Sequence, residues 1–120
     1  MEIKYHKPIG KPAVAELTDA DFIISRTQDI LDIFGDLMAS GCERIIIHEK
    51  NLHPGFFDLK TGLAGDVLQK FSNFRIKLAV VGDFTKYSSK SLGDFIYESN
   101  KSGSAYFTNN IDSALLSLQK

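Results

Sequence analysis

Acidic and imidazole side chains cluster near the middle of the sequence, and such groups can hold and transfer protons near neutral pH. They follow two β-prone runs, RIIIH and LAVV. Sites in open α/β sheets gather beyond the carboxyl ends of the strands, so both runs lead into loops where chemistry could take place. The acid/base candidates for a small enzyme are Glu49, His53, Asp58 and Asp83.

The same region contains metal-ligating residue types, but their spacing does not fit a metal site. HEKNLH, which contains His48 and His53, departs from H-E-x-x-H, in which the two histidines lie one helical turn apart. We expect a packed His48 and a solvated His53. Cys42 follows a predicted helix C-terminus, where the helix dipole disfavours a thiolate. We therefore expect Cys42 to be a small core residue rather than a nucleophile. The sequence predicts no metal, no cofactor and no assigned catalytic residue.

The segment HPGFFDLKTGLAG shows no clear helical or strand period, and it supplies the candidate partner or switch site. We expect a helix from about Thr61 to Ser72. The Thr61 hydroxyl would lie at the N-terminus of this helix, beside unpaired N–H groups, where a phosphate or other anion is favoured. Alternatively, Thr61 is only a helix cap and GFF is an apolar lid on the core. The candidate site residues are Phe56, Phe57, Asp58, Lys60, Thr61 and Gly62.

The elements that position these residues can be read from the apolar pattern. Two short strands are expected around residues 3–5 and 13–17, followed by a helix that starts near Arg26 with a Ser25/Gln28 capping box. Its apolar residues at helical spacing are Ile30, Ile33, Phe34, Leu37 and Met38. ERIIIHE and IKLAVVGDF are continuous apolar runs typical of strands covered on both faces.

The C-terminal part continues the alternation of helices and strands. A helix capped by Ser88 or Ser89 and stopped by Gly103 precedes the strand SAYFT. A last helix follows, capped by Asn109 or Asn110. The sequence therefore predicts one α/β domain over residues 1–120, with a mixed, mostly parallel sheet of about five strands and about four helices. We expect these residues to be largely buried: Phe34, Leu37, Ile45, Ile47, Leu68, Phe71, Leu78, Val80, Phe95, Ile96 and Leu115.

Composition excludes several functional classes. The chain has 120 residues, 43% of them apolar, and a formal net charge of -1. Its lysines are spread along the sequence without the clustering that duplex DNA requires, so we expect no nucleic-acid partner. Apolar runs are too short to cross a bilayer, and the lone cysteine forms no internal disulfide, so we expect a cytoplasmic protein without a membrane partner.

Two family resemblances add to this interpretation. NLHPGFFDLKTGLAGDVLQKFSNFRIKLAVVGDF, continued by SSKSLGDFIYESN, resembles an uncharacterised bacterial family catalogued as domain of unknown function 4180, over nearly the whole chain from the first helix on. More distantly, the order of elements resembles the STAS domain, the anti-sigma-factor antagonist module. FFDLKTGL is similar to the STAS loop that opens a helix and carries a regulatory Ser or Thr, which corresponds to Thr61.

We therefore expect a STAS-like fold and a non-enzymatic regulatory or protein-interaction module. Its partner would be a protein that contacts Phe56, Phe57, Asp58, Lys60 and Thr61. One alternative is a module that binds a small anionic ligand between the Thr61 helix mouth and the Gly82 loop. The other alternative is the small enzyme that uses the four acid/base candidates. The sequence does not identify the oligomeric state.

Overall fold

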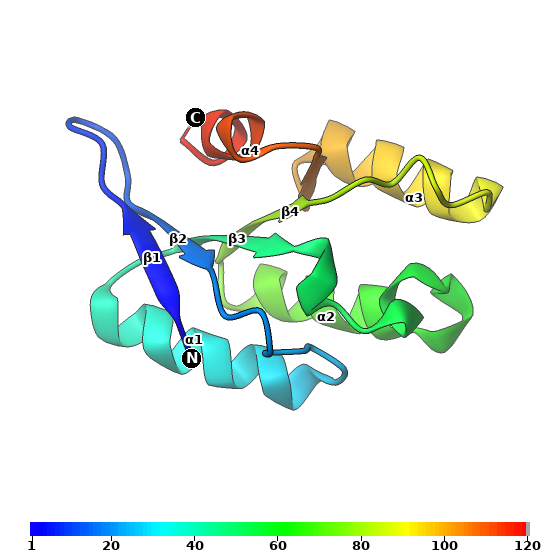
Figure 1. Ribbon diagram of the computed structural model, residues 1–120, viewed down its shortest axis with the longest axis horizontal. Coiled ribbons are helices and arrows are strands. Elements are labelled where there is room, and N and C mark those ends of the chain that lie inside the picture. Colours follow the sequence, from blue (N-terminus) through cyan, green and yellow to red (C-terminus); the bar gives the residue numbers. More distant parts are fainter. Residues whose placement is uncertain (120) are drawn as a thin grey trace.

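The computed structural model describes residues 1–119 and contains a five-stranded sheet in which the strand order follows the chain order (Figure 1). β1 pairs with β2 in antiparallel fashion, and each later strand pairs in parallel with the strand before it. The predicted mixed, mostly parallel sheet is confirmed. The strands are β1 (Ile3–His6), β2 (Val14–Leu17), β3 (Arg44–His48), β4 (Lys77–Val81) and β5 (Tyr106–Thr108).

Four α-helices and three short 3₁₀ helices lie within residues 1–119. The α-helices are α1 (Thr27–Ser40), α2 (Leu63–Asn73), α3 (Lys90–Ser102) and α4 (Ile111–Leu118). The 3₁₀ helices are η1 (Glu49–Asn51), η2 (Pro54–Phe57) and η3 (Leu59–Thr61), which follow one another directly after β3. None of these helices is long and apolar enough to cross a membrane.

The helices cover the two faces of the sheet unequally. Ile45 and Ile47 of β3 belong to the large core beneath α1, α2 and α3, whereas Ile46 packs with residues of α4 on the other face. Right-handed crossovers that all move in one direction along the sheet place their helices on the same face. Since α4 follows the last strand, it can turn back over the opposite face (Figure 1). β3 is therefore buried on both faces, as its continuous apolar run predicts.

Helix boundaries agree with the sequence within a residue or two, and the largest shift described is at the start of α2. α1 begins directly after Arg26, as predicted, but Asp29 rather than Gln28 closes the first turn by accepting from the N–H groups of Ser25 and Arg26. The expected inward position of Met38 is wrong, because it lies one residue beyond Leu37 and faces solvent with 61% of its surface exposed. The predicted ends of the later helices are confirmed: Ser89 caps α3, Gly103 stops it, and Asn110 caps α4.

Most of the expected core is buried. Cys42 is buried as predicted, with its thiol near the carbonyl oxygens of Ala13 and Arg44. Leu68, Phe95, Ile96 and Leu115 are only half-buried, since they lie at the margins of the two core clusters. The expected core residues that are buried are Phe34, Leu37, Ile45, Ile47, Phe71, Leu78 and Val80.

Candidate functional site

The segment after β3 owes its irregular pattern to three successive 3₁₀ helices, whose residues do not follow the period of an α-helix. Phe56 and Phe57 are buried in the main core. Phe57 stacks on Tyr87 with ring centroids 4.8 Å apart. The expectation that these two rings are presented on the surface is therefore corrected: the turns of η2 direct both rings inward, and they anchor the segment as the lid interpretation described.

Thr61 uses its hydroxyl group to close this segment. The hydroxyl hydrogen is shared between the carbonyl oxygens of Gly55, at 2.6 Å, and Asp58, at 2.9 Å. The Thr61 oxygen also accepts from the N–H of Leu63 at 3.2 Å. The predicted helix start at Thr61 is corrected to Leu63, because Gly62 has a left-handed backbone (φ 78°) that separates η3 from α2. Asp58 and Lys60 remain exposed beside it.

Glu49 is the centre of a second group of contacts, formed where the loops after β3 and β4 meet. One carboxylate oxygen, Oε2, lies 2.6 Å from the Tyr87 hydroxyl and 2.7 Å from Nζ of Lys86. The other, Oε1, accepts from the N–H of Asp83 at 3.2 Å. Burial alone would raise the pKa of Glu49, but the contacts with Lys86, Tyr87 and Asp83 outweigh burial and lower that pKa below its usual value. The pKa of Tyr87 is raised by burial and by the adjacent carboxylate.

Gly82 allows these two loops to approach each other. A Cβ atom at Gly82 would lie 2.6 Å from the Cβ of Glu49 and 2.7 Å from its Oε1. Such distances are too short for non-bonded heavy atoms. A side chain at this position would therefore displace the Glu49 carboxylate from its three partners.

The four acid/base candidates do not converge. Glu49 and the Asp83 backbone are in contact, but His53 is engaged locally, where its Nδ1 accepts from the N–H of Gly55. Asp58 likewise accepts from the N–H of Lys60. Glu49, His53 and Asp83 each line a different hollow of the surface. The arrangement is therefore unlike that of a general acid and base placed around one reacting atom.

Glu49 borders a shallow depression of about 530 Å³, here called the Tyr87 hollow. Its apolar part includes Ile23, which is 44% exposed, and the edges of the buried Leu52 and Phe57. The Tyr87 ring forms one wall, with Nζ of Lys86 5.5 Å from its centroid. The residues that line it are Ile23, Glu49, Lys50, Leu52, Pro54, Phe57, Lys86 and Tyr87.

Thr61 lies in a different and smaller hollow of about 370 Å³. Arg26 and His53 share it, but so does Asp66, which would repel an anion. Gly82 lines another hollow with Asp83. The structure therefore does not assemble the Thr61 helix mouth and the Gly82 loop into one anion site.

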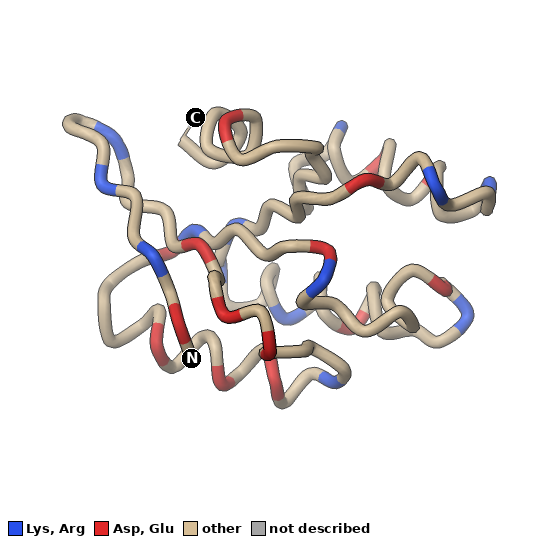
Figure 2. Tube along the Cα trace, viewed as in Figure 1, with Lys and Arg blue, Asp and Glu red and all other residues tan. Residues whose placement is uncertain are grey.

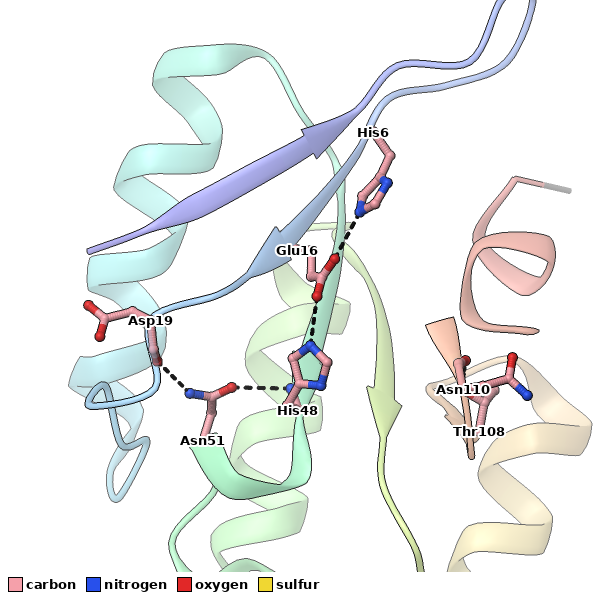
Figure 3. Close-up of polar contacts among 7 residues, drawn as sticks. All are labelled: His6, Glu16, Asp19, His48, Asn51, Thr108 and Asn110. Carbon is pink, nitrogen blue, oxygen red and sulfur yellow. Dashed lines mark hydrogen bonds and ion pairs between the residues drawn. The ribbon is translucent and has the colours of Figure 1, made fainter. Parts of the chain in front are cut away.

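A third group, a carboxylate between two histidines, has no signal in the sequence pattern, because its members come from three different strands. Glu16 of β2 lies with Oε1 2.9 Å from Nε2 of His6 and with Oε2 2.8 Å from Nε2 of His48 (Figure 3). Burial would raise the pKa of Glu16, but its hydrogen bonds to His48 and His6 outweigh burial and lower it. This His–Glu–His bridge runs across β1, β2 and β3. His48 is half-buried and within β3, in agreement with the packed histidine expected there.

Asn51 extends these polar contacts into the loop before α1. Its amide nitrogen donates to the carbonyl oxygens of Asp19 and Phe22, and its amide oxygen accepts from the N–H of His48. Figure 3 shows the bonds to Asp19 and His48. The side chain is fully buried, and every one of these bonds satisfies a backbone group. The hydrophobic period does not indicate Asn51, because two of its partners, Asp19 and Phe22, are distant in the chain. Within residues 1–119, no group of three or more His, Cys, Asp or Glu side chains is placed to hold a metal ion.

These features define a small α/β domain with a mixed five-stranded sheet and helices on both faces. The chain belongs to the family described as Domain of unknown function (DUF4180), whose model matches residues 10–118. No curated protein and no solved structure matches the chain.

Proposed function

We propose that the protein is a cytoplasmic, non-enzymatic regulatory module with a STAS-like fold, which acts by binding another protein at the Tyr87 hollow. The STAS-like assignment rests on the order of elements, a strand pair followed by alternating helices and strands that end in a helix. It also rests on the similarity of the FFDLKTGL segment to the regulatory loop of that superfamily.

The observation that carries the proposal is the composition of the Tyr87 hollow. Its floor and walls are apolar, with Ile23 exposed at the rim. Lys50 and Lys86 add two ammonium groups, of which Glu49 neutralises one. An apolar depression with a polar rim is typical of a protein contact in which one partner inserts an anchor side chain. The matching segment would carry an apolar side chain next to a carboxylate that faces Lys50.

The state of the titratable groups also supports binding rather than catalysis. Glu49 is occupied by Lys86, Tyr87 and the Asp83 N–H, and Glu16 is occupied by its two histidines. Thr61 donates its hydroxyl hydrogen to carbonyl oxygens of its own loop. Groups with these internal partners serve to fix loop geometry, and a fixed surface loses less conformational entropy when a partner binds.

A peptide-display selection tests the proposal. The full chain is the bait, and enriched peptides are then measured by isothermal titration against wild type and Ile23→Glu. We expect peptides with an apolar residue next to Asp or Glu, and we expect Ile23→Glu to weaken binding at least about tenfold, because it places a buried charge in the interface. Tyr97→Glu is the matched control, since Tyr97 is a large exposed side chain on α3 (64% exposed) outside the Tyr87 hollow.

Two results would contradict the proposal. One is a selection that enriches no peptide. The other is a set of peptides whose affinity falls equally with Ile23→Glu and Tyr97→Glu.

A further inference from the structure

Charge is distributed unevenly along the first third of the chain. Residues 3–13 contain three lysines and no acidic residue, whereas residues 18–43 contain six acidic residues and one arginine. In the folded chain, the lysines lie on β1 and the turn after it, and the acidic residues lie on α1 and the loops that flank it (Figure 2). The N-terminal part of the chain thus forms a basic region and an acidic region, although the net charge of the whole chain is only -1.

The basic region is a projecting turn between β1 and β2, here called the arm (residues 7–13). Its tip residue Ile9 is completely exposed, and Lys7 and Lys11 on either side of it are exposed as well. Pro8 and Pro12 fix φ at two positions, which restricts the conformations available to the arm. Glu16 lies near the base of the arm, but its carboxylate already contacts the imidazole groups of His6 and His48.

The acidic region includes the outward face of α1. Asp32 and Asp36 lie one helical turn apart and are exposed. Within residues 1–119, neither of them forms an ion pair, and Asp32 accepts only a hydrogen bond from Gln28. Met38 also faces solvent, but it lies two residues after Asp36 and therefore on another side of the helix.

The two regions are complementary. The arm offers two ammonium groups, and α1 offers two carboxylates one helical turn apart. Figure 1 shows the arm and the C-terminal end of α1 at the same end of the molecule, with β1 between them. The outer edge of β1 has no strand partner among residues 1–119 and would lie within a contact formed there.

We propose that two copies of the chain associate through this end, with the arm of each copy lying on the outward face of α1 of the other. A twofold axis makes the two contacts identical and closes the assembly as a dimer. Lys7 and Lys11 then face Asp32 and Asp36. This inference is separate from the Tyr87 hollow and does not depend on partner binding there.

Sedimentation equilibrium of the full chain at low and high ionic strength tests the dimer. We expect dimers at about 20 mM salt, and we expect the dissociation constant to rise about tenfold or more at about 300 mM salt, because the contacts between exposed charges are screened. A chain that remains monomeric at low salt up to about 0.5 mM protein would overturn the proposal, since closed, specific dimers form well below that concentration.

Charge reversal tests which surfaces meet. The arm variant Lys7→Glu/Lys11→Glu and the helix variant Asp32→Lys/Asp36→Lys should each be monomeric, because like charges then face each other. An equimolar mixture of the two variants should form a heterodimer, and one chain that carries all four substitutions should form a homodimer again. The control Lys60→Glu/Lys101→Glu makes the same charge change at exposed positions outside the contact and should leave the dimer intact.

Rescue by mixing is the decisive outcome. A mixture that stays monomeric, or single variants that remain dimeric, would show that the arm and α1 do not meet. Melting curves verify that each variant is folded. If a charge-reversed variant proves unfolded, the neutral variant Lys7→Gln/Lys11→Gln or Asp32→Asn/Asp36→Asn replaces it. Each neutral variant should dimerise more weakly than wild type, because it loses the attraction without creating repulsion.

Discussion

At the scale of single residues, Thr61 closes the η2–η3 segment with one hydroxyl group. Thr61→Ala leaves the carbonyl oxygens of Gly55 and Asp58 without this donor and the N–H of Leu63 without this acceptor. We expect the free energy of unfolding to fall by about 1–2 kcal/mol. Urea denaturation measures this difference.

Thr61→Ser is the matched control, since it keeps the hydroxyl group and should lose less than half as much stability. Thr61→Glu removes the donor and should therefore be destabilised like Thr61→Ala, although its charge lies near the N-terminus of α2. A Thr61→Ala variant as stable as wild type would show that these loop bonds contribute nothing.

Glu16 should make stability depend on pH on the acidic side. Its pKa is lowered in the folded chain, so its contribution is fully present above the ordinary glutamate pKa of about 4.3 and is lost as the pH falls through the lower, folded value. We expect Glu16→Gln to be less stable than wild type at pH 7, with a gap that narrows toward pH 3. Urea denaturation across this range measures the gap.

Glu2→Gln provides the comparison, because Glu2 is an exposed glutamate next to β1, which pairs with the strand that contains Glu16. Its stability should differ little from wild type at any pH. If the gap between wild type and Glu16→Gln stays constant down to pH 3, the histidines do not hold the carboxylate in its charged form.

At the scale of elements, the 3₁₀ segment is stable because its aromatic rings are buried. Phe56 lies between Phe57, with ring centroids 5.0 Å apart, and Phe107 of β5 at 6.4 Å. Phe56→Ala should cost about 3–5 kcal/mol, because it removes a fully buried ring from a packed core. Phe95→Ala should cost less, because Phe95 is only half-buried. If urea denaturation shows the same loss of unfolding free energy for Phe56→Ala and Phe95→Ala, the buried ring of η2 does not stabilise the segment more than a half-buried ring does.

The helices and strands could be predicted because the signals that mark them, the apolar pattern and the capping residues, lie within or next to each element. The runs around Ile46 and Ala79 have no alternation, as expected for strands covered on both faces, and the caps at Ser89 and Asn110 lie next to the helices that they begin. Met38 shows the limit of this reasoning. Residues at the edge of the apolar stripe of a helix can face either the core or solvent, and the packing of the neighbouring elements decides which.

The candidate site could be predicted only in part, because its contacts join distant segments. The loops after β3 and β4 were identified from the sequence, but the burial of Phe57 depends on Tyr87, thirty residues further along. The Glu16–His48 contact depends on the register between β2 and β3, which no sequence pattern specifies. The sequence indicates that Thr61 lies near a turn, but it does not identify the carbonyl oxygens that accept its hydroxyl hydrogen.

At the scale of the whole molecule, α4 covers the second face of the sheet, where Val14, Ile46 and Ala79 are fully buried. Leu118→Ala should lower the free energy of unfolding by about 2–4 kcal/mol, because its buried side chain packs on these residues. Leu116→Ala on the same helix should change it by less than about 0.5 kcal/mol, since Leu116 is 64% exposed. Equal melting temperatures for the two variants would contradict this arrangement.

The match between strand order and chain order affects how the protein is made on the ribosome. Each parallel strand pairs with the one that left the exit tunnel before it, so the sheet can grow outward as synthesis proceeds, without waiting for a distant segment. α4 emerges last. Until it does, Ile46 and Ala79 face water on a nascent chain whose first face is already assembled. The nascent protein therefore passes through a stage in which one face of the sheet is covered and the other is apolar and exposed, and that stage lasts until α4 packs on the sheet.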